Sequence, residues 1–332
     1  MKIGVLGAGS WGTALAILLH ENGHEVTLWS IDKREVAMID EKREQVEKLP
    51  GVMIPDRIAV TNDVESSVTG KDMLVMAVPS IFVRSTSKMI APYIKEGQLI
   101  VNVAKGIEED TLMNMTDIIE DEIKQARVGV LSGPSHAEEV GRRIPTTVVA
   151  GAHDKATAEE IQEAFMSPVF RVYTSPDMVG IELGAALKNV IALAAGIVDG
   201  LGLGDNTKAA LITRGIAEIT RLGLAMGGRF ETFIGLSGIG DLIVTCTSTH
   251  SRNHNAGYLI GQGKSYQEAM DEVKMVVEGV YSAKAALALA KKYNVEVPIT
   301  EQVNQVLFEG RSAKDAVTSL LMRNRTSECD WS

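Results

Sequence analysis

The stretch KIGVLGAGSWGTALAILLHENGHEVTLW, residues 2–29, decides the fold. Residues 2–6 form a short apolar run typical of a buried strand, and residues 11–21 repeat apolar side chains at helical spacing. The Asn22-Gly23 pair ends the predicted helix, and EVTLW at 25–29 predicts a second strand. About 30 residues of strand, helix and strand are enough for a parallel crossover, so the chain opens with a βαβ unit.

A glycine turn, GAGSWG at residues 7–12, joins the first strand to the first helix. Gly7 permits the tight turn, Gly9 lets the backbone approach a pyrophosphate, and Gly12 allows close packing of helix on strand. The helix N-terminus then offers free N–H groups to an anion. The turn predicts a dinucleotide site, with a plain glycine-rich turn as the alternative. A second run, GLGLGDN at 200–206, lies between helical segments and predicts only a loop.

Strands and helices continue to alternate along the first half of the chain. Further buried-strand runs lie at 72–79, 98–106, 126–135, 146–151 and 169–175, and helical stretches such as 80–91 and 112–124 separate them. This alternation predicts a doubly wound parallel sheet of the Rossmann type.

The composition changes after Pro176. Residues 178–332 are rich in Ala, Leu, Gly and Glu at helical spacing, with glycine-rich breaks at 196–204, 223–228 and 235–240. We therefore expect two domains, an α/β Rossmann domain over 1–177 and an all-α domain over 178–332. The tail at 323–332 is expected to be frayed.

Composition restricts the protein class. The formal net charge of -10 argues against a general nucleic-acid binder, which needs a basic face. The only two cysteines, Cys246 and Cys329, cannot form a disulfide framework and lack zinc spacing, which favours a reducing cytoplasm. No signal peptide and no uninterrupted run of about 18 apolar residues is found, so we expect no membrane partner.

The corner after the second strand bears on the choice between NAD and NADP. Asp32 lies about 20 residues past Gly12, where an acid binds the ribose hydroxyl of NAD. Ser30 takes the corner itself, however, and Lys33 with Arg34 are placed to meet the 2′-phosphate of NADP. Alternatively, these charges begin a solvated helix, so the sequence leaves the coenzyme open.

Two further corners at the carboxyl ends of strands carry polar residues. Lys105 follows the strand 99–103, and Ser132-Gly133-Pro134-Ser135 follows the strand 128–131. Ser135 with Glu138 forms a capping-box pattern, which predicts that Ser135 starts a helix near the ligand. A simple cap for Ser135 and a solvated loop position for Lys105 are the alternatives.

Lys188 is the only ionisable side chain between Glu182 and Asp199, in the run ALKNVIALAAG at 186–196. Burial destabilises the charged form of a lysine and lowers its pKa, which makes Lys188 a candidate proton donor near neutral pH. The alternative is a lysine whose head reaches solvent along the apolar surface. Asn189 beside it and Gly184 one turn earlier indicate room for a ligand.

The segment 235–257 concentrates polar residues after a glycine-rich entry. Arg252 is suited to bidentate binding of a phosphate, and Asp241 to orienting Lys188 or binding a substrate hydroxyl. Ser251, Asn253 and His254 lie beside them, and a polar surface loop is the alternative. His250 and His254 have i,i+4 spacing, but no acid lies between them in the zinc-protease pattern, so no metal is assigned.

The chain resembles the bacterial NAD(P)-dependent glycerol-3-phosphate dehydrogenases over about residues 2–310. The motifs that carry the resemblance are GAGSWGTALA, VNVAKGIE, LSGPSHAEEV, ELGAALKNVIALAAGIVDGLGLGDNTKAALITRG, GLSGIGDLIVTCTSTHSRN and VVEGVYSA. The resemblance implies a Rossmann domain followed by a helical domain like that of phosphogluconate dehydrogenase. It also implies reversible reduction of dihydroxyacetone phosphate to sn-glycerol 3-phosphate, the backbone precursor of phospholipids, and a homodimer as a possible assembly.

The resemblance also implies roles for individual residues. Lys188 matches the proton-transfer lysine of the family. The matching substrate positions are Lys105, Gly133, Ser135, Asp241, Ser251, Arg252 and Asn253. The matching coenzyme positions are Ser10, Trp11, Lys105, Ala137, Arg252, Val276 and Glu278, to which the residues themselves add Gly7, Gly9, Gly12 and Lys33. Without the resemblance, Glu278 is equally a solvated helix acid.

Two other functions compete with this interpretation. One is a dehydrogenase of the same architecture that acts on a small hydroxy acid. The other is a regulator that senses nicotinamide coenzymes without turnover. The set of Lys188, Asp241 and Arg252 argues against the regulator, because coenzyme binding alone does not require it.

Overall fold

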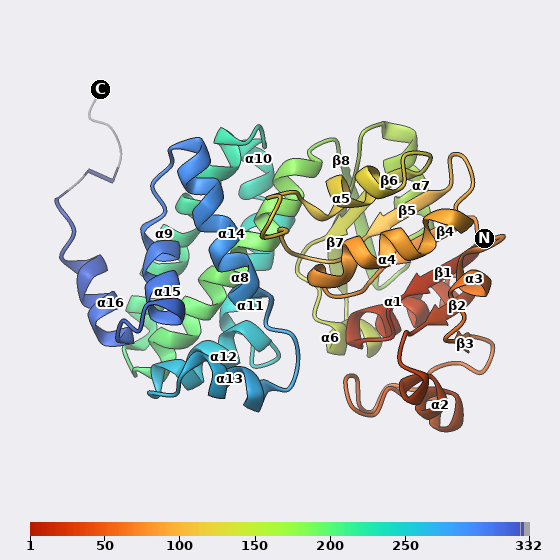
Figure 1. The fold of residues 1–332 in the computed structure, drawn as a ribbon, viewed down its shortest axis with the longest axis horizontal. Helices are drawn as coiled ribbons and strands as arrows, with labels where there is room; N and C mark the ends of the chain where they lie inside the picture. The colour runs from red at the N-terminus through yellow and green to blue at the C-terminus, as the bar shows by residue number, and fades with distance from the viewer. Residues whose placement is uncertain (326, 329–332) are drawn as a thin grey trace.

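An eight-stranded sheet, in the order β3-β2-β1-β4-β5-β6-β7-β8, forms the N-terminal half of the computed structural model (Figure 1). The structure describes residues 1–325, 327 and 328. The strands are β1 (Lys2–Leu6), β2 (Glu25–Trp29), β3 (Ala59–Thr61), β4 (Met73–Met76), β5 (Leu99–Asn102), β6 (Arg127–Ser132), β7 (Thr146–Ala152) and β8 (Phe170–Ser175). Each predicted strand is present at its expected place. The short β3 was not predicted, because three residues are too few to show a periodic pattern.

The strand directions differ from the prediction at one end of the sheet. Neighbouring strands from β3 to β6 are parallel, but β7 pairs antiparallel with β6, and β8 runs parallel to β7. The prediction of a wholly parallel sheet is therefore wrong for β7 and β8. A parallel crossover usually contains a full helix that covers the sheet. Only the five-residue helix α6 (Ala137–Gly141) lies between β6 and β7, whereas the longer α7 (Lys155–Phe165) joins β7 to β8.

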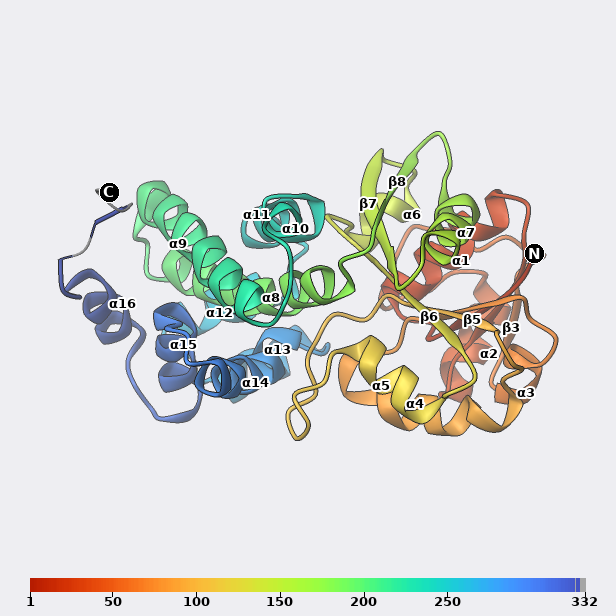
Figure 2. The ribbon, with the colours of Figure 1, turned by 90° about the horizontal axis from the view of Figure 1, so that it is seen from above.

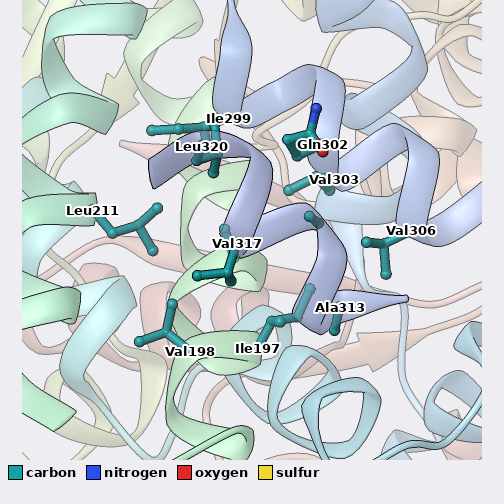
Figure 3. A pocket seen from close by; sticks show the side chains of 12 residues that line it. Ile197, Val198, Leu211, Ile299, Gln302, Val303, Val306, Ala313, Val317 and Leu320 are labelled. Carbon is teal, nitrogen blue, oxygen red and sulfur yellow. The ribbon is translucent and has the colours of Figure 1, made fainter. Parts of the chain in front are cut away.

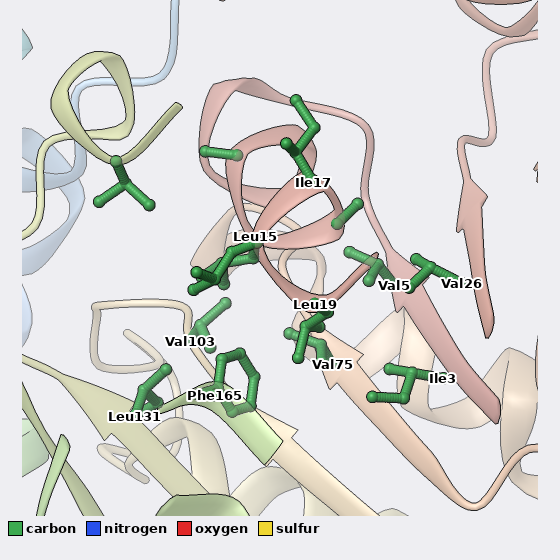
Figure 4. Packing of buried hydrophobic residues seen from close by; sticks show 14 of the residues in the cluster. Ile3, Val5, Leu15, Ile17, Leu19, Val26, Val75, Val103, Leu131 and Phe165 are labelled. Carbon is green, nitrogen blue, oxygen red and sulfur yellow. The ribbon is translucent and has the colours of Figure 1, made fainter. Parts of the chain in front are cut away.

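Alternate residues of the central strands enter two separate cores, which makes the sheet doubly wound. Val5, Val75 and Val101 belong to the cluster beneath α1 (Ser10–Glu21), α6 and α7. Figure 4 shows Val5 and Val75 in this cluster with Leu15 and Phe165. The adjacent strand residues, such as Leu6, Leu74 and Ile100, enter the opposite core beneath other helices. Those helices are α3 (Val64–Val68), α4 (Val83–Ile90) and α5 (Met115–Glu122).

The rest of the described chain is helical, as the composition predicted. α8 (Met178–Gly200) leaves the sheet and runs through the middle of the helical half (Figure 2). Around it lie α9 (Gly204–Ala225), α10 (Phe230–Phe233), α11 (Asp241–Thr247), α12 (Arg252–Gly261), α13 (Tyr266–Val273), α14 (Glu278–Tyr293), α15 (Pro298–Phe308) and α16 (Ala313–Leu321). Residues 201–203 form the break predicted after α8, while α9 begins inside the predicted loop 200–206.

Two described segments, Met178–Gly200 and Phe230–Thr247, are long and apolar enough to cross a membrane by length and composition alone. The most apolar window of the first is 100% buried inside the fold, as in the core helix of a globular protein. The corresponding window of the second is 39% buried. The expectation of no membrane partner therefore stays a prediction.

The far end of the helical half is closed by α16. An apolar cavity of about 30 Å³ remains where α16 meets α8, α9 and α15, with Ile197, Leu211 and Val317 among its lining residues (Figure 3). The tail at 323–332, predicted to be frayed, lies partly outside the described residues, and Cys329 lies wholly outside them.

Candidate active site

A cleft of about 990 Å³ lies where the carboxyl ends of the strands face the helical half. Residues that follow β1, β2, β4, β5 and β6 line one side, and residues of α8, α11, α12 and α14 line the other. The predicted site residues in this lining are Gly7, Gly9, Ser10, Trp11, Lys105, Ser135, Ala137, Lys188, Asp241, Ser251, Arg252, Asn253, Val276 and Glu278. Gly12, Lys33 and Gly133 lie outside the lining.

The glycine turn forms the sheet side of the cleft. Gly7 has a φ of +118°, a conformation that side chains rarely adopt, and a Cβ on Gly12 would lie 1.9 Å from the carbonyl oxygen of Gly7. A Cβ on Gly9, by contrast, would have no heavy atom within 4 Å. The indole Nε1 of Trp11 is buried and has no hydrogen-bond partner among the described residues. The turn therefore presents open backbone and one unpaired donor to a ligand.

Lys188 lies in the middle of α8 with only 5% of its surface exposed. Its Nζ donates to Thr245 Oγ1 at 2.7 Å and lies 3.2 Å from Asp241 Oδ1. Burial lowers the pKa of Lys188 to about 8, the Asp241 carboxylate opposes that change, and the neighbouring Lys105 adds to it. The head of Lys188 is therefore held inside the protein, and the alternative in which it reaches solvent is wrong.

Asp241 is a buried carboxylate shared by two lysines. Its Oδ2 lies 2.7 Å from the Nζ of Lys105, which also donates to the carbonyl oxygen of Gly133 at 3.1 Å. Asp241 begins α11 directly after a π-helical turn, η3 (Leu236–Gly240). Such turns recur at functional sites, where they redirect side chains. One aspartate thus joins a lysine from the sheet half to a lysine from the helical half.

The start of α12 approaches α8 closely because both helices carry glycine at the contact. A Cβ on Gly196 would lie 2.0 Å from the carbonyl oxygen of His254, and one on Gly257 would lie 2.0 Å from that of Leu193. This packing places Asn253 Nδ2 3.0 Å from Asn189 Oδ1, next to Lys188. Asn253 Oδ1 also accepts the N–H of Gly279 at 2.8 Å, so this side chain ties three helices together.

Arg252 is the first residue of α12 and lines the cleft. Its guanidinium makes no hydrogen bond and no ion pair with the described residues, but its positive charge acts on the Glu278 carboxyl and opposes the rise in the pKa of that group. An unpaired guanidinium facing a cleft is suited to bidentate binding of a phosphate or carboxylate. The cleft therefore combines a buried proton donor with a separate anion-binding group.

Known proteins resemble this chain over nearly its whole length. The model of the NAD-dependent glycerol-3-phosphate dehydrogenase N-terminus matches residues 2–158, and that of the C-terminus matches residues 177–318. The glycerol-3-phosphate dehydrogenase [NAD(P)+] of Agathobacter rectalis is 63% identical over 98% of this chain and 97% of its own. The enzyme of the same name from Fusobacterium nucleatum is 61% identical over 99% and 98%.

The chain belongs to the NAD-dependent glycerol-3-phosphate dehydrogenase family. It is an NAD(P)-dependent oxidoreductase acting on a CH–OH group. A crystal structure of glycerol-3-phosphate dehydrogenase from Coxiella burnetii has the same fold, with a TM-score of 0.94 at 37% identity over 97% of this chain and 99% of that one. The predicted Rossmann domain followed by a helical domain is thereby confirmed.

The coenzyme corner of this family member differs in detail from the sequence interpretation. β2 ends at Trp29 as expected, but Asp32 caps α2 (Lys33–Lys42) by accepting the N–H of Arg34 at 2.8 Å. Hydrogen bonds from Arg34 hold the pKa of the Asp32 carboxyl below its usual value. The Lys33 side chain is exposed and lies outside the cleft lining, in the arrangement expected of a solvated helix start.

Glu35 and Lys48 line the cleft in this corner, where we had expected Lys33. Both line the cleft and form an ion pair, and Gln45 Nε2 donates to the same Glu35 carboxylate at 2.7 Å. Neither residue was predicted. Lys48 lies in an irregular segment whose return to the corner has no local pattern in the sequence.

Ser135 does not cap α6, which corrects a second expectation. α6 begins at Ala137, its N-cap is His136, and Ser135 Oγ instead donates to the Gly133 carbonyl at 2.9 Å. Ser251 takes a capping role instead, because its side chain accepts the N–H of His254 at 3.2 Å at the start of α12.

Glu278 is not a solvated helix acid. It accepts the backbone N–H of Ser80 at 3.1 Å and also the Ser80 hydroxyl, which links α14 to the turn after β4. Burial raises the pKa of Glu278, and the bonds from Ser80 oppose that change.

The two histidines at i,i+4 spacing have different surroundings. His250 lines the cleft, with its ring centroid 5.9 Å from that of His136, whereas His254 turns away and lies 2.8 Å from Asp199. Within the described part of the chain, no three or more His, Cys, Asp or Glu side chains are grouped to hold a metal ion.

Proposed function

We propose that this family member catalyses the reversible NAD(P)H-dependent reduction of dihydroxyacetone phosphate to sn-glycerol 3-phosphate. The observation that carries the proposal is the buried Lys188, whose Nζ lies 3.2 Å from Asp241 Oδ1 in a cleft that also holds the unpaired guanidinium of Arg252. A phosphorylated ketone needs both groups, a cation for its phosphate and an acid for its carbonyl oxygen. The product is the backbone precursor of phospholipids, which implies a role in lipid synthesis.

Lys188 acts as the proton donor in the direction of reduction. When bound, the reduced nicotinamide supplies a hydride to the carbonyl carbon of the substrate. The ammonium of Lys188 stabilises the negative charge that develops on the carbonyl oxygen and gives its proton to that oxygen. With a pKa of about 8, Lys188 is charged at neutral pH and is a stronger acid than a solvated lysine.

Asp241 and Thr245 hold the proton donor in place. Thr245 Oγ1 accepts from Lys188 and in turn donates to the Asp241 backbone carbonyl at 2.6 Å, so the hydroxyl has a defined direction. Asp241 also pairs with Lys105 at the edge of the sheet, and we assign the Lys105 ammonium to the substrate. Thr245 has no pattern of its own in the sequence and was not predicted.

The substrate phosphate binds to Arg252 at the start of α12. Ser251 and Asn253 hold that helix start through the contacts described above, and Ser135 lines the same cleft. This assignment makes Arg252 a group for substrate affinity and Lys188 a group for turnover.

The residues of the glycine turn fit a dinucleotide. Gly9 leaves its surroundings open, and Trp11 Nε1 is buried without a partner among the described residues. Gly7, Ser10 and Trp11 would hold the pyrophosphate at the N-terminus of α1. Ala137, Val276 and Glu278 line the same cleft and complete the set that we assign to the coenzyme.

The proposal includes a domain boundary, a cellular location and an assembly. We place the boundary between residues 177 and 178, because β8 ends at Ser175 and α8 begins at Met178. A cytoplasmic homodimer is the assembly and location expected from the resemblance.

The test is oxidation of reduced coenzyme by the purified protein. We expect absorbance at the nicotinamide band to fall on addition of dihydroxyacetone phosphate, with NADH and NADPH in separate samples to give the coenzyme preference. A 2-keto acid of similar size is the matched control and is expected to give little turnover. Turnover of the keto acid instead would support the hydroxy-acid dehydrogenase. Coenzyme binding without turnover of either compound would support the regulator.

A further inference from the structure

Glu182 is a buried acid on α8 that takes no part in the mechanism above. Only 4% of its surface is exposed, and it does not line the cleft. Its carboxylate accepts the N–H of Thr116 at 3.0 Å and the Thr116 hydroxyl, at the first turn of α5. It also accepts Asn102 Nδ2 at 3.1 Å, at the end of β5. All of these donors belong to the sheet half, so this side chain fastens α8 to the sheet.

Asn102 connects Glu182 to the turn that contains Lys105. The Oδ1 of Asn102 accepts the N–H of Ala104 at 3.0 Å, and its Nδ2 donates to the Ala104 carbonyl at 3.1 Å. Both backbone groups of the residue before Lys105 are therefore held by one side chain. Lys105 then bonds Asp241, and Asp241 pairs with Lys188. The sequence of contacts starts and ends on α8.

We propose that Glu182 is a positioning residue, which sets the distance between Lys105 and the Asp241–Lys188 pair by fixing the 102–105 turn to α8. The inference rests on the proposed roles of Lys188, Lys105 and Asp241. Glu182 touches neither substrate nor coenzyme, so its effect reaches the reaction only through Asn102 and Lys105.

A second buried glutamate provides a matched control. Glu218 on α9 is 2% exposed and accepts the N–H of Ile299 at 2.8 Å, the N–H of Thr300 at 3.0 Å and the Thr300 hydroxyl at 2.6 Å. Like Glu182, it therefore binds the first turn of another helix, here α15, and burial raises the pKa of both carboxyls. Both helices of this second contact lie in the helical half, away from the cleft. The two sites have the same chemistry and differ in whether they are connected to Lys105.

Loss of the Glu182 contact should change the proton affinity of Lys188. Burial is the main cause that lowers the pKa of Lys188, the Asp241 carboxylate raises it, and the Lys105 charge lowers it further. Cys246 and His136 also interact with the Lys188 charge, and neither belongs to the 102–105 turn. If the 102–105 turn is released, the Lys105 charge moves away and Asp241 pairs with Lys188 alone. Both changes raise the pKa of Lys188, so reduction should persist to higher pH than in the wild type.

The experiment compares Glu182→Ala with Glu218→Ala in the full-length protein, with thermal unfolding measured for both. Both variants are expected to lose stability, because each leaves buried donors unpaired. Only Glu182→Ala is expected to lower kcat, by about 10-fold to 100-fold, and to move the alkaline limb of its pH profile upward. Glu182→Gln keeps an acceptor oxygen and should retain the wild-type profile.

Asn102→Ala serves as a second variant if Glu182→Ala does not fold. It breaks the link to Ala104 while leaving Thr116 bonded to Glu182, and it should produce the same upward shift of the alkaline limb. An unshifted limb in Asn102→Ala, or equal kcat and pH profiles for Glu182→Ala and Glu218→Ala, would overturn the proposal. So would a loss in Glu182→Gln as large as that in Glu182→Ala. Lys188→Met tests the proposed function separately from the proposal on Glu182. If Lys188→Met stays active, Lys188 is not the proton donor, whatever the Glu182 variants show.

Discussion

The two sides of the cleft present different chemical groups. On the sheet side, the glycine turn offers backbone groups and open space, with a helix N-terminus behind it. On the helical side, charged side chains carry the site, and two of them, Lys188 and Asp241, are almost fully buried. The difference indicates a division of labour. In the proposed function, shape and backbone on the sheet side hold most of the coenzyme, whereas desolvated charge performs the chemistry, because electrostatic interactions strengthen where water is excluded.

The largest effect is expected from removing the buried charge. Lys188→Met should lower kcat by about 10²–10⁴-fold, the usual contribution of a positioned proton donor. Coenzyme affinity should change little, because Lys188 is not among the residues that we assign to the coenzyme. Steady-state turnover and titration of NADH fluorescence give the two readings. The control is Lys208→Met. Lys208 lies on α9 and pairs with Asp199 near the end of α8. Turnover near the wild-type value in Lys188→Met would remove the distinction between the two sides.

A smaller effect is expected at the phosphate. Arg252→Ala should raise KM for dihydroxyacetone phosphate by about 10-fold to 100-fold, which corresponds to losing one charged hydrogen-bonding group. The effect on kcat should be smaller, since the proton donor is untouched. Initial rates over a range of substrate concentrations separate the two constants. An unchanged KM would remove Arg252 from the anion site.

On the sheet side, a substitution at Gly9 is expected to change coenzyme affinity without changing the stability of the fold. Gly9 has a φ of −69° and open surroundings, so alanine fits the folded chain but fills the space where a pyrophosphate would approach. Gly9→Ala should weaken coenzyme binding by about tenfold or more, about 1.4 kcal/mol. Gly12→Ala is the contrast, because its Cβ would meet the Gly7 carbonyl and unfold the turn. Wild-type coenzyme affinity in Gly9→Ala would mean that the dinucleotide does not use this turn.

The smallest effect is expected at the exposed corner. Lys33→Ala should change the affinity for NADPH by less than about twofold, as surface substitutions away from a site usually do. Lys33 is exposed and outside the cleft lining, while Lys48 lies within it. Titration of both coenzymes against Lys33→Ala provides the measurement. A large loss confined to NADPH would restore Lys33 to the coenzyme site.

The same two sides differ in how well the sequence predicts them. The glycine turn and the strands around it follow local patterns, so β1, α1 and β2 lie where the pattern places them. Lys188 was also visible, because a single lysine in a long apolar run has no other local reason to be there. Residues fixed by distant contacts were not visible. Thr245 acts through Lys188, 57 residues away in the chain, and Glu35 and Lys48 meet through an irregular segment without a periodic pattern. A capping pattern wrongly assigned Ser135 to a helix start. The reversal at β7 accompanies the short helix α6, whose end the sequence pattern did not show.

The pH dependence of kcat/KM tests the central claim, that buried Lys188 is the proton donor, most directly, because kcat/KM reports the ionisation of the free enzyme. Reduction requires a protonated lysine in this account, so kcat/KM should be constant at low pH and fall as pH rises through an apparent pKa near the value of about 8 expected for Lys188. The oxidation of sn-glycerol 3-phosphate needs the neutral lysine and should show the opposite dependence. A kcat/KM that stays flat from about pH 6.5 to about pH 9.5 in both directions, with chemistry rate-limiting, would contradict the assignment of Lys188 as the acid.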